Sequence, residues 1–581
     1  MKIAIHVTHE AIQKIGGIGA VLHGLITNKR YQKKCPHTLL YSPLFDRNGE
    51  LKSRLGNDAQ VLYSGLDKYD ANKWRNKFHT IEKKYGVHIV FGKKKFFYQN
   101  SKRQFTTTDI IAIDIWDMPP EIVNDFKFEL WKYYGIQSDN FQHDRDYEQY
   151  LRIAIALKDI FETLYGSKNQ AIIFSHEYMG MASALAFEIA KQKKERKDDI
   201  TIFYAHEVST ARMVVENHPG HDFTFYNILN FDRDVGFSLE DEFGSYSHYS
   251  RSELVKKATN LDYFFAVSDL TKEEFLFLCP HADQKKVVVV YNGVPTEDIS
   301  FRDKEKSRKL VQKYCENLYN FSPDYIFTHV ARLIVSKGFW RDISFLYYLD
   351  EHFAAKGLKG FFIILSTLVG NGRHINNIRK MEGDYGWPVV HREGWPDLIG
   401  AEVDIYKYLE LFNARSMAIK GVFINQFGFN KESCGDRMPD GISLLDLRAA
   451  SDIEFGLSVY EPFGIAQLET LPYGGIPMVS RACGCASLLK KNLKDDEYLC
   501  IDFSRIPGSF IEQFKTKHDF MNVDRGVRDQ IEREICREAV PRLTAILPKN
   551  DKERKTRFKD IQKRSHLFDW DHITKNVVEH I

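Results

Sequence analysis

The sequence predicts an α/β protein with two separate sheets of mainly parallel strands, each covered by helices. With 581 residues the chain exceeds one ordinary domain and allows two large hydrophobic cores. Short runs of β-branched and aromatic residues alternate with helical stretches, which is typical of parallel α/β layers. A polar, strongly charged segment from Pro295 to Pro323 divides these runs into two sets, so we expect one sheet on each side of it.

The runs can be assigned to strands in chain order. In the first half we expect strands at Ile3–Val7, Thr38–Tyr41, Ile110–Ile115, Ala171–Phe174, Ile200–Tyr204, Tyr263–Val267 and Val287–Tyr291. In the second half we expect them at Tyr325–Val330, Gly360–Leu365, Val389–Val390, Val422–Ile424, Phe455–Val459, Pro477–Val479 and Leu499–Ile501. The aromatic-rich stretch from Tyr63 to Tyr150 is an elaboration that periodicity does not resolve. Within the dividing segment, Lys304 to Lys313 has helical character.

Composition and charge narrow the class of protein. Hydrophobic residues make up 43% and charged residues 28% of the chain, as in soluble globular proteins. The 81 basic and 79 acidic residues nearly cancel, and acidic residues interrupt the longer lysine clusters, so we expect no nucleic-acid partner. There is no apolar run of membrane-spanning length, and the first residues resemble a strand rather than a signal peptide, which predicts a cytoplasmic protein. The eight cysteines lack metal-ligand spacing, so neither zinc nor disulfides are expected.

The first chemical motif follows the first strand. The run Lys14-Ile15-Gly16-Gly17-Ile18-Gly19 precedes a stretch with helical spacing. Glycines between a strand and a helix let the backbone approach a ligand closely and expose amides at the positive end of the helix. The alternative is a tight turn that needs glycine for steric reasons alone.

Two further strands of the first half end in His-Glu pairs, His176-Glu177 and His206-Glu207. Ligands bind at the carboxyl ends of strands in open α/β sheets, so polar residues there are candidates for a site. A structural histidine, satisfied by its neighbours, is the alternative for each of them.

The second half carries two more motifs. Arg332 and Lys337 follow its first strand, and near the C-terminus Glu461 and Glu469 lie eight positions apart. Pro462 suits the first turn of a helix, and a helix that starts there would place both carboxylates on roughly the same face, two turns apart. A solvated helix face and two surface cations are the alternatives.

Together these motifs resemble those of glycogen and starch synthases, retaining glycosyltransferases of the GT-B architecture. The Glu-x7-Glu pair, the Lys-x-Gly-Gly-x-Gly loop, the strand before His206 and the spacing from Arg332 to Lys337 all occur in the order of that family. The resemblance covers both halves, including the ending Leu567 to Ile573. The chain departs from it around both His-Glu pairs, where the bacterial enzymes have His-Asp-Trp-His and His-Asn.

The resemblance implies a fold of two facing Rossmann-like domains with a deep cleft between them. We expect the first domain at residues 1–300, a linker at 301–323, the nucleotide-sugar-binding domain at 324–555, and a C-terminal helix, 556–581, that crosses back to the first domain.

The resemblance also implies roles for individual residues. The catalytic candidates are His206, which contacts the transferred sugar, Arg332 and Lys337, which hold the donor diphosphate, and Glu461, which orients the sugar hydroxyls. The candidates for donor binding are Lys14, Gly16, Gly17, Phe463, Gly464, Ile465 and, at the ribose, Glu469. His176 is a second candidate for a sugar contact. The scheme implies neither metal nor cofactor, and the nucleotide sugar is the substrate.

Three functions remain open from the sequence. The first is transfer of glucose from ADP-glucose or UDP-glucose to an α-glucan. The second keeps the donor chemistry but uses a small sugar, a sugar phosphate or another glycan as acceptor. The third is a non-catalytic scaffold that binds nucleotide sugars or glucans. The retention of Glu461, Glu469, Arg332, Lys337 and His206 favours an enzyme, because a scaffold need not keep all five. The sequence leaves the oligomeric state open.

Overall fold

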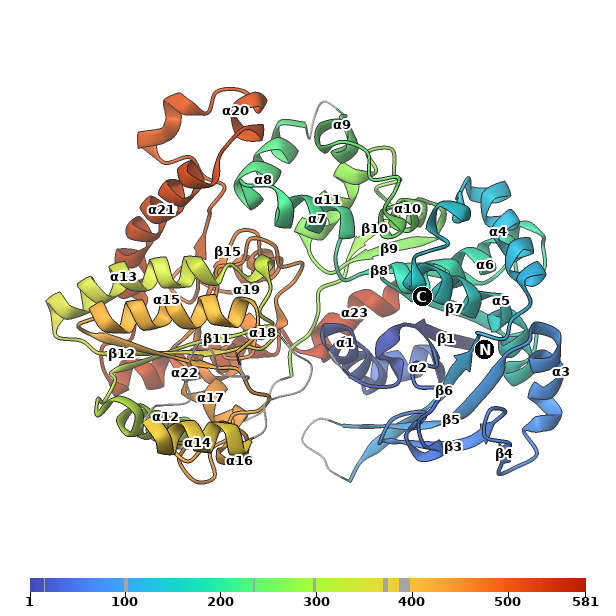
Figure 1. Cartoon of the computed structure of the whole chain (residues 1–581), viewed down its shortest axis with the longest axis horizontal. Coiled ribbons are helices and arrows are strands. Elements are labelled where there is room, and N and C mark those ends of the chain that lie inside the picture. Colours follow the sequence, from blue (N-terminus) through green and yellow to red (C-terminus); the bar gives the residue numbers. More distant parts are fainter. Residues whose placement is uncertain (15, 99–102, 233–235, 296–298, 369–374, 386–397) are drawn as a thin grey trace. The chain divides into compact units, whose positions relative to one another are not determined.

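The computed structural model describes residues 1–14, 16–98, 103–232, 236–295, 299–368, 375–385 and 398–581. The chain forms two compact units (Figure 1). The first unit comprises residues 1–211, 232–295 and 569–581, and the second comprises residues 212–231 and 296–568. Each unit contains one sheet of mainly parallel strands with alternating helices, so the predicted α/β class with two sheets is confirmed.

The sheet of the first unit has ten strands in the order β10-β9-β8-β7-β1-β2-β6-β5-β3-β4. The strands are β1 (Lys2–Val7), β2 (His37–Pro43), β3 (Ala59–Ser64), β4 (Tyr69–Asp70), β5 (His88–Phe97), β6 (Phe105–Asp114), β7 (Gln170–His176), β8 (Ile200–Ala205), β9 (Tyr263–Ala266) and β10 (Val287–Val289). From β10 to β6 all neighbours are parallel, whereas β5, β3 and β4 extend the sheet as antiparallel strands. The antiparallel extension and its helices account for most of the stretch, residues 63–150, that periodicity did not resolve.

The helices of the first unit are α1 (Gly17–Ile26), α2 (Lys29–Lys34), α3 (Arg75–Tyr85), α4 (Pro120–Tyr134), α5 (Arg145–Tyr165), α6 (Met181–Gln192), α9 (Leu239–Phe243), α10 (Ser250–Lys256), α11 (Asp269–Leu278) and α23 (Trp570–Glu579). Helix α7 (Ser209–Asn217) spans the boundary between the units. The central strands are continuous hydrophobic runs, and in β7 every residue from Ala171 onward is buried, as expected for parallel strands covered on both faces.

The sheet of the second unit has six strands, all parallel, in the order β13-β12-β11-β14-β15-β16. The strands are β11 (Tyr325–Val330), β12 (Gly360–Leu365), β13 (Ile419–Ile424), β14 (Ile453–Gly456), β15 (Ile476–Ser480) and β16 (Leu499–Ile501). The strand expected at Val389–Val390 lies outside the described residues.

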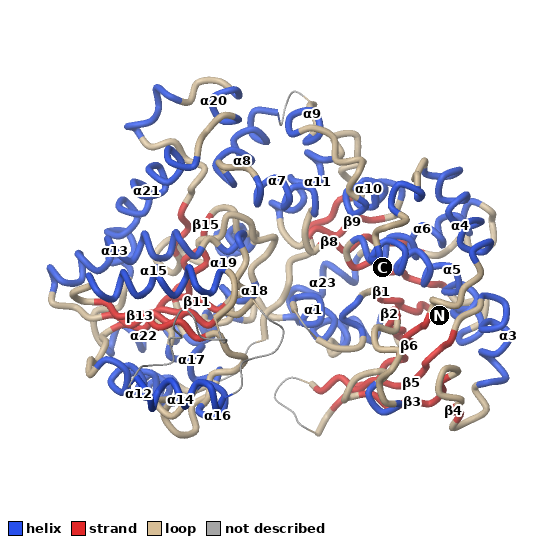
Figure 2. The backbone as a smooth tube through the Cα atoms, in the orientation of Figure 1, coloured by secondary structure: helices blue, strands red, loops and turns tan. Residues whose placement is uncertain are grey.

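Helices cover both faces of this second sheet (Figure 2). The helices of this unit are α8 (His221–Asp232), α12 (Phe301–Tyr319), α13 (Phe339–Lys356), α14 (Ile375–Tyr385), α15 (Ala401–Arg415), α16 (Lys431–Cys434), α17 (Leu444–Ala450), α18 (Ile465–Leu468), α19 (Cys485–Asn492), α20 (Lys517–Met521), α21 (Arg525–Ile546) and α22 (Asp551–Ser565). Helices α13 and α15 lie on one face, and α12 and α17 pack together on the other.

The unit boundaries differ from the expected domains in three places, of which the linker is the first. Residues 301–323 hold helix α12, capped by a reciprocal box between Ser300 and Asp303. Its inner face, with Val311 and Tyr314, is fully buried in the second core. The charges that suggested a linker lie mostly on the outer face, although Arg308 pairs with buried Asp452 at 2.6 Å.

The second difference concerns the C-terminal segment 556–581. Helix α22 belongs to the second unit, where Arg557 donates hydrogen bonds to the carbonyls of Gly474 and Glu497. Only residues 569–581, with helix α23, belong to the first unit. There Trp570 packs directly against α1, and a Cβ atom at Gly24 would lie 2.0 Å from the indole. A side chain at this position would therefore displace the helix.

The third difference is that residues 212–231 belong to the second unit. Asp222 of α8 forms an ion pair with Arg341 at 2.5 Å, and Arg341 also bonds Glu532 at 2.7 Å. Phe223 of the same helix packs on Phe514 at a ring distance of 4.9 Å. Contacts across more than one hundred positions of sequence hold this segment, so local patterns did not indicate it.

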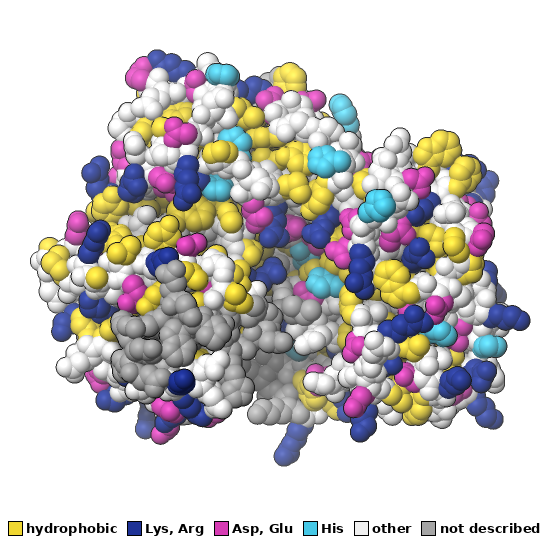
Figure 3. All heavy atoms as spheres, viewed as in Figure 1, with side chains coloured by type: hydrophobic (Ala, Val, Ile, Leu, Met, Phe, Trp, Pro, Cys, Tyr) yellow, Lys and Arg dark blue, Asp and Glu magenta, His cyan; other side chains and the backbone are white. Residues whose placement is uncertain are grey.

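On the face shown in Figure 3, basic and acidic side chains are interspersed among the described residues, in line with the near-neutral net charge. Among the described residues, no helix is both long and apolar enough to span a bilayer.

Candidate functional site

A row of histidine rings lies at the carboxyl edge of the first sheet. Strands β1, β7 and β8 are adjacent and parallel, and they end near His6, His176 and His206. Nδ1 of His6 lies 2.8 Å from Nε2 of His176, and Nδ1 of His176 lies 2.9 Å from Nε2 of His206. Nε2 of His6 lies 2.7 Å from the hydroxyl of Tyr31. Four side chains thus form one continuous hydrogen-bonded row.

The rings of this row are uncharged. Burial lowers the pKa of His6 to about 3 and that of His206 to about 3. Burial, together with the neighbouring histidines, holds the pKa of His176 well below its usual value. A neutral imidazole has one N–H donor and one acceptor nitrogen, so every bond in the row must point in the same direction. The row has two consistent proton arrangements: one leaves an N–H at Nδ1 of His206, and the other leaves a bare acceptor there.

This arrangement separates the two histidines that the sequence singled out. His176 is fully buried and both of its ring nitrogens are engaged within the row, so it holds His206 in place instead of contacting a sugar as first expected. His206 is half-buried, and its Nδ1 is the ring nitrogen that the row does not use. His6 was missed by sequence reasoning. Its position in the first strand, parallel to two other strands with terminal histidines, was the available signal.

Glu177 fixes the backbone at His206. Its carboxylate accepts hydrogen bonds from the backbone N–H of His206 and, at 2.7 Å, from that of Glu207. Glu177 itself has φ of 58°, a left-handed conformation that costs a residue with a side chain of order 1 kcal/mol or more. Backbone strain beside a candidate site is consistent with a conformation kept for function.

The glycine loop of the first unit holds a carboxylate of the protein itself. Oε2 of Glu10 accepts hydrogen bonds from the amides of Gly16 at 2.7 Å and Gly19 at 2.9 Å. The amide of Gly16, expected to face the donor phosphate, is therefore engaged in this structure. Lys14 and Gly17 are exposed, and a Cβ atom at Gly17 would meet open space. Sequence spacing gave no sign of Glu10, which lies before the motif.

In the second unit, two of the predicted residues form an ion pair. Lys337 lies in the loop after β11, and its ammonium group bonds the carboxylate of Glu461. The carbonyl of Ser336 accepts hydrogen bonds from the amides of Val459 at 2.9 Å and Tyr460 at 3.2 Å, which ties this loop to the segment after β14. Arg332, in the same loop, is exposed, and among the described residues no carboxylate is paired with it. Of the two predicted cations, Lys337 is therefore ion-paired, whereas Arg332 is available to a ligand.

The segment between the two glutamates is not the continuous helix that the sequence predicted. Glu461 forms a bridge with Cys483, and the helix α18 begins only at Ile465 and ends at Leu468. Gly464 has φ of 94°, and a Cβ atom there would lie 2.6 Å from Sγ of Cys483. Pro462 therefore precedes the helix, and the two carboxylates are positioned by separate elements.

Glu469 has its own partners. Its carboxylate pairs at 2.6 Å with Arg448, which is buried and pairs at 3.0 Å with Glu454 of β14. Glu454 also accepts a hydrogen bond from the hydroxyl of Thr328 on β11. Arg448 and Glu454 were missed because nothing in their local sequence distinguishes them from other helix and strand residues. They fix the carboxylate of Glu469 while leaving 35% of its side chain exposed.

The described residues contain one group with the spacing of metal ligands, His88, Asp114 and Asp117. The guanidinium of Arg47 bonds both of its carboxylates, with Asp114 at 3.0 Å, and so supplies the positive charge there. His88 begins β5 and Asp114 ends β6, and none of the three belongs to a motif that the sequence singled out.

No protein-family model and no curated protein matches the chain. Among solved structures it is similar to a trehalose-6-phosphate protein from E. coli bound with UDP-2-fluoro glucose, with 14% identity, a TM-score of 0.49 and coverage of 100% of this chain and 98% of that chain. An α,α-trehalose-phosphate synthase from Burkholderia xenovorans in complex with glucose-6-phosphate shares 13% identity with a TM-score of 0.49, over 100% and 99% of the two chains.

The catalytic domain of starch synthase IV from Arabidopsis thaliana, bound to ADP and acarbose, shares 15% identity with a TM-score of 0.45, over 97% and 99%. At these identities and scores the likeness does not assign an activity, so the function proposed below rests on the residues of this chain.

Proposed function

We propose that the protein is a retaining glycosyltransferase of the GT-B type that transfers glucose from ADP-glucose or UDP-glucose to a carbohydrate acceptor. The observation that carries the proposal is the pair of Lys337 and Glu461 at the carboxyl edge of the second sheet, with the unpaired guanidinium of Arg332 in the same loop. A departing diphosphate needs positive charge, and these two cations supply it at the edge where α/β sheets bind ligands.

Each residue then has a role. Arg332 and Lys337 neutralise the diphosphate as it leaves, with help from amides near Phe463, Gly464 and Ile465. Binding of the diphosphate draws Lys337 from Glu461, whose carboxylate is then available for the sugar hydroxyls. Glu469, held by Arg448, binds the ribose. These interactions strengthen with the charge that develops in the transition state, which is what accelerates a reaction.

The residues of the first unit act on the sugar. His206 contacts the transferred glucose through Nδ1, and the row behind it sets whether that nitrogen donates or accepts a hydrogen bond. Lys14 and Gly17 lie beside the donor phosphate. Retention follows if the leaving phosphate takes the proton of the acceptor hydroxyl on the face from which it departs, which requires neither a covalent enzyme intermediate nor a metal. The protein is proposed to act in the cytoplasm.

The acceptor remains a choice between an α-glucan, as in glycogen and starch synthesis, and a small sugar, sugar phosphate or other glycan. A scaffold without activity is the third candidate, and the intact set of charged residues disfavours it. Incubation of the purified protein with labelled ADP-, UDP- and GDP-glucose, with and without glycogen, tests the proposal. Turnover of one donor supports a transferase, and growth of polymer identifies a synthase. Absence of turnover with every donor and acceptor would refute the enzyme proposal, and chelation that abolishes turnover reversibly would refute the metal-free scheme.

A further inference from the structure

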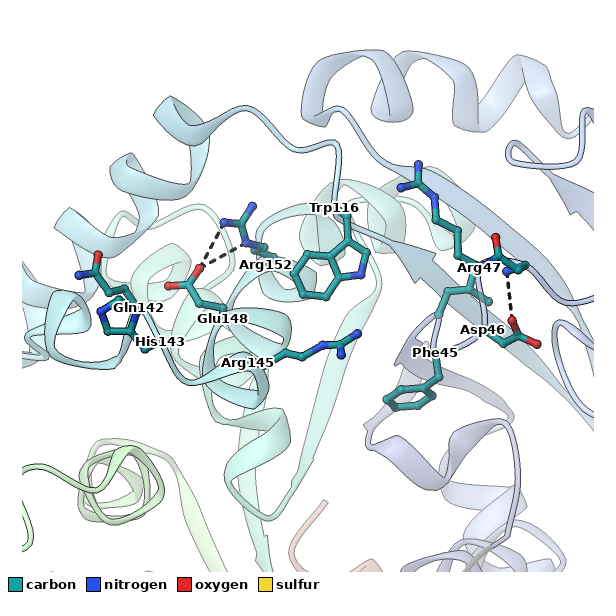
Figure 4. A pocket seen from close by; sticks show the side chains of 11 residues that line it. Phe45, Asp46, Arg47, Trp116, Gln142, His143, Arg145, Glu148 and Arg152 are labelled. Atoms are coloured by element: carbon teal, nitrogen blue, oxygen red, sulfur yellow. Dashed lines mark hydrogen bonds and ion pairs between the residues drawn. The ribbon is translucent and has the colours of Figure 1, made fainter.

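The first unit contains a pocket that none of the predicted site residues lines. It has a volume of about 690 Å³ and opens where β2 and β6 end, with one wall formed by the start of α5 (Figure 4). Strands β2 and β6 are parallel to β1, which in turn is parallel to β7. The pocket therefore lies at the same edge of the sheet as the histidine row.

The α5 wall of the pocket is connected to that row. Asp146, in the first turn of α5, accepts a hydrogen bond from the hydroxyl of Tyr178 at 3.2 Å. Tyr178 follows two residues after His176, at the end of β7. A ligand held against the start of α5 thus lies on the edge that carries His206.

The charged side chains that line the pocket differ in whether an oppositely charged group is paired with them. Glu148 is neutralised by Lys127 at 2.5 Å and Arg152 at 3.3 Å, and Arg47 is held by Asp114 and Asp117. The other acidic residue of the lining is Asp46, whose carboxylate accepts a hydrogen bond from the amide of Asn48 at 3.0 Å. The guanidinium of Arg145 differs from these, because in the part of the chain that the structure describes no carboxylate is paired with it. Its contact is the ring of Trp116, at 5.5 Å. Arg145 is exposed and is the first residue of α5, whose N-terminal amides are capped by the carboxylate of Asp144.

The same wall offers flat apolar surfaces. Trp116 is 40% exposed and Phe45 is 51% exposed, and both line the pocket. An exposed indole with a free guanidinium beside it suits a ligand that has an apolar ring face and an anionic group. Sugar rings provide such a face through their C–H groups, and a phosphate ester provides the charge.

We propose that this pocket is the acceptor site and that it binds a hexose phosphate, with the phosphate on Arg145 and the sugar ring on Trp116. The inference rests on the proposed glycosyl transfer and names its acceptor class. In the reaction a hydroxyl of the bound sugar forms a bond to the anomeric carbon of the donor glucose. The bond from that carbon to the diphosphate oxygen breaks, and the diphosphate leaves with the electron pair and takes the hydroxyl proton.

Binding to the full chain without any donor tests the site directly. Calorimetric titrations with glucose 6-phosphate, glucose and inorganic phosphate should show glucose 6-phosphate binding on the order of tenfold more tightly than either of the others, because only it engages both Arg145 and Trp116. Arg145→Gln should remove most of the advantage of glucose 6-phosphate over glucose, whereas Trp116→Leu should weaken both sugars. Arg30→Gln, a change at an exposed arginine on α2, is the matched control and should bind all three ligands as the parent does.

Two results would overturn the inference. Glucose 6-phosphate that binds no more tightly than glucose would exclude the phosphate contact, and equal binding of inorganic phosphate would exclude the sugar contact. Donor turnover measured on the same preparations separates this site from the proposed function. Turnover with glycogen but no binding of glucose 6-phosphate refutes the site alone, whereas Arg145-dependent binding without turnover of any nucleotide sugar refutes the transferase.

Discussion

The two sheets hold the polar side chains at their carboxyl edges in opposite ways. The first sheet aligns three imidazoles that share hydrogen bonds as neutral rings. The second sheet places a lysine and two arginines against carboxylates, some of them fully buried. A row of neutral rings can shift protons from end to end with little change in charge, whereas buried ions keep their charge and attract or repel a ligand at a fixed place. We infer that the first edge adjusts to a sugar hydroxyl and the second is built for a diphosphate.

A substitution among the buried ion pairs of the second unit should lower the free energy of unfolding more than a substitution in the histidine row. Arg341 is fully buried between Asp222 and Glu532 and also donates to the carbonyls of Leu457 and Ser458. Arg341→Met leaves Asp222 buried without its cation and leaves Glu532 with the cation of Arg528, at 3.6 Å, so the free energy of unfolding should fall by about 3–5 kcal/mol. Urea unfolding measures this loss. The exposed control Arg302→Met should stay within about 0.5 kcal/mol of the parent. A loss below about 1 kcal/mol for Arg341→Met would show that the ions of this edge are not essential to its stability.

The next largest effect concerns the paired lysine. Lys337→Ala removes the cation that faces Glu461, and kcat/KM should fall by an amount equivalent to about 2–4 kcal/mol. Only 14% of each side chain of the pair is exposed, so the variant also leaves Glu461 largely buried without its cation, and some stability should be lost as well. The measurement is steady-state turnover of the preferred donor alongside thermal unfolding, with the exposed Lys309→Ala as control. If the Lys337 variant keeps full activity on every donor that the parent uses, the diphosphate assignment fails and the motif is only a surface cation.

The neutral histidines at the edge of the first sheet should make the free energy of unfolding depend on pH in the acidic range. Burial lowers the pKa of His6 from its ordinary value of 6.5, which the unfolded chain keeps, to about 3 in the folded chain. Below pH 6.5 the unfolded chain therefore binds a proton that the folded chain does not, and stability falls as the pH drops from about 6.5 towards 3. His6→Phe should reduce the slope of unfolding free energy against pH by about 1.4 kcal/mol per unit in this window.

The control for this measurement lies in the same row. Tyr31→Phe removes a hydrogen-bond partner of His6 but no imidazole, so the slope should keep the value of the parent. Urea midpoints between pH 6.5 and 4.5 give the slopes. Equal slopes for His6→Phe and the parent would mean that His6 is protonated in the folded protein and that the two edges differ less than the geometry indicates.

The smallest effect is expected at Glu469. Glu469→Gln keeps the shape of the side chain but weakens its bond to Arg448 and, in the proposed mechanism, its bond to the donor ribose, which does not change during the reaction. The KM of the donor should rise by roughly tenfold or less, with kcat nearly constant. Initial rates over a range of donor concentrations separate the two constants. A fall in kcat at unchanged KM would place Glu469 at the reacting sugar and not at the ribose.

The sequence predicted the repetitive parts of the fold well because parallel strands and their helices repeat a simple pattern. The strand ends at His176 and His206 and the loop with Lys337 were recognisable because each motif is local. The partners Arg448 and Asp222 were not, since they lie in other segments of the chain than the residues they bind and meet them only after folding. Glu10 is close in sequence to Gly16 but lies outside the glycine motif, so the motif gave no sign of it. Gly464 shows the opposite error: the sequence predicted a helix from Pro462 onward, but the left-handed backbone of Gly464 delays the start of the helix to Ile465.

The assignment of residues 212–231 to the second unit has a genetic consequence. The chain passes between the units four times, after residues 211, 231, 295 and 568. Neither unit is therefore encoded by one uninterrupted stretch of the gene. A recombination event that exchanged residues 296–568 for those of a relative would combine the incoming Arg341 with the resident Asp222 and Phe223, and the hybrid would survive only where the two parents agree at those positions. Variation in α8 and in the start of α13 should accordingly be inherited together, although 119 positions of sequence separate the two charges.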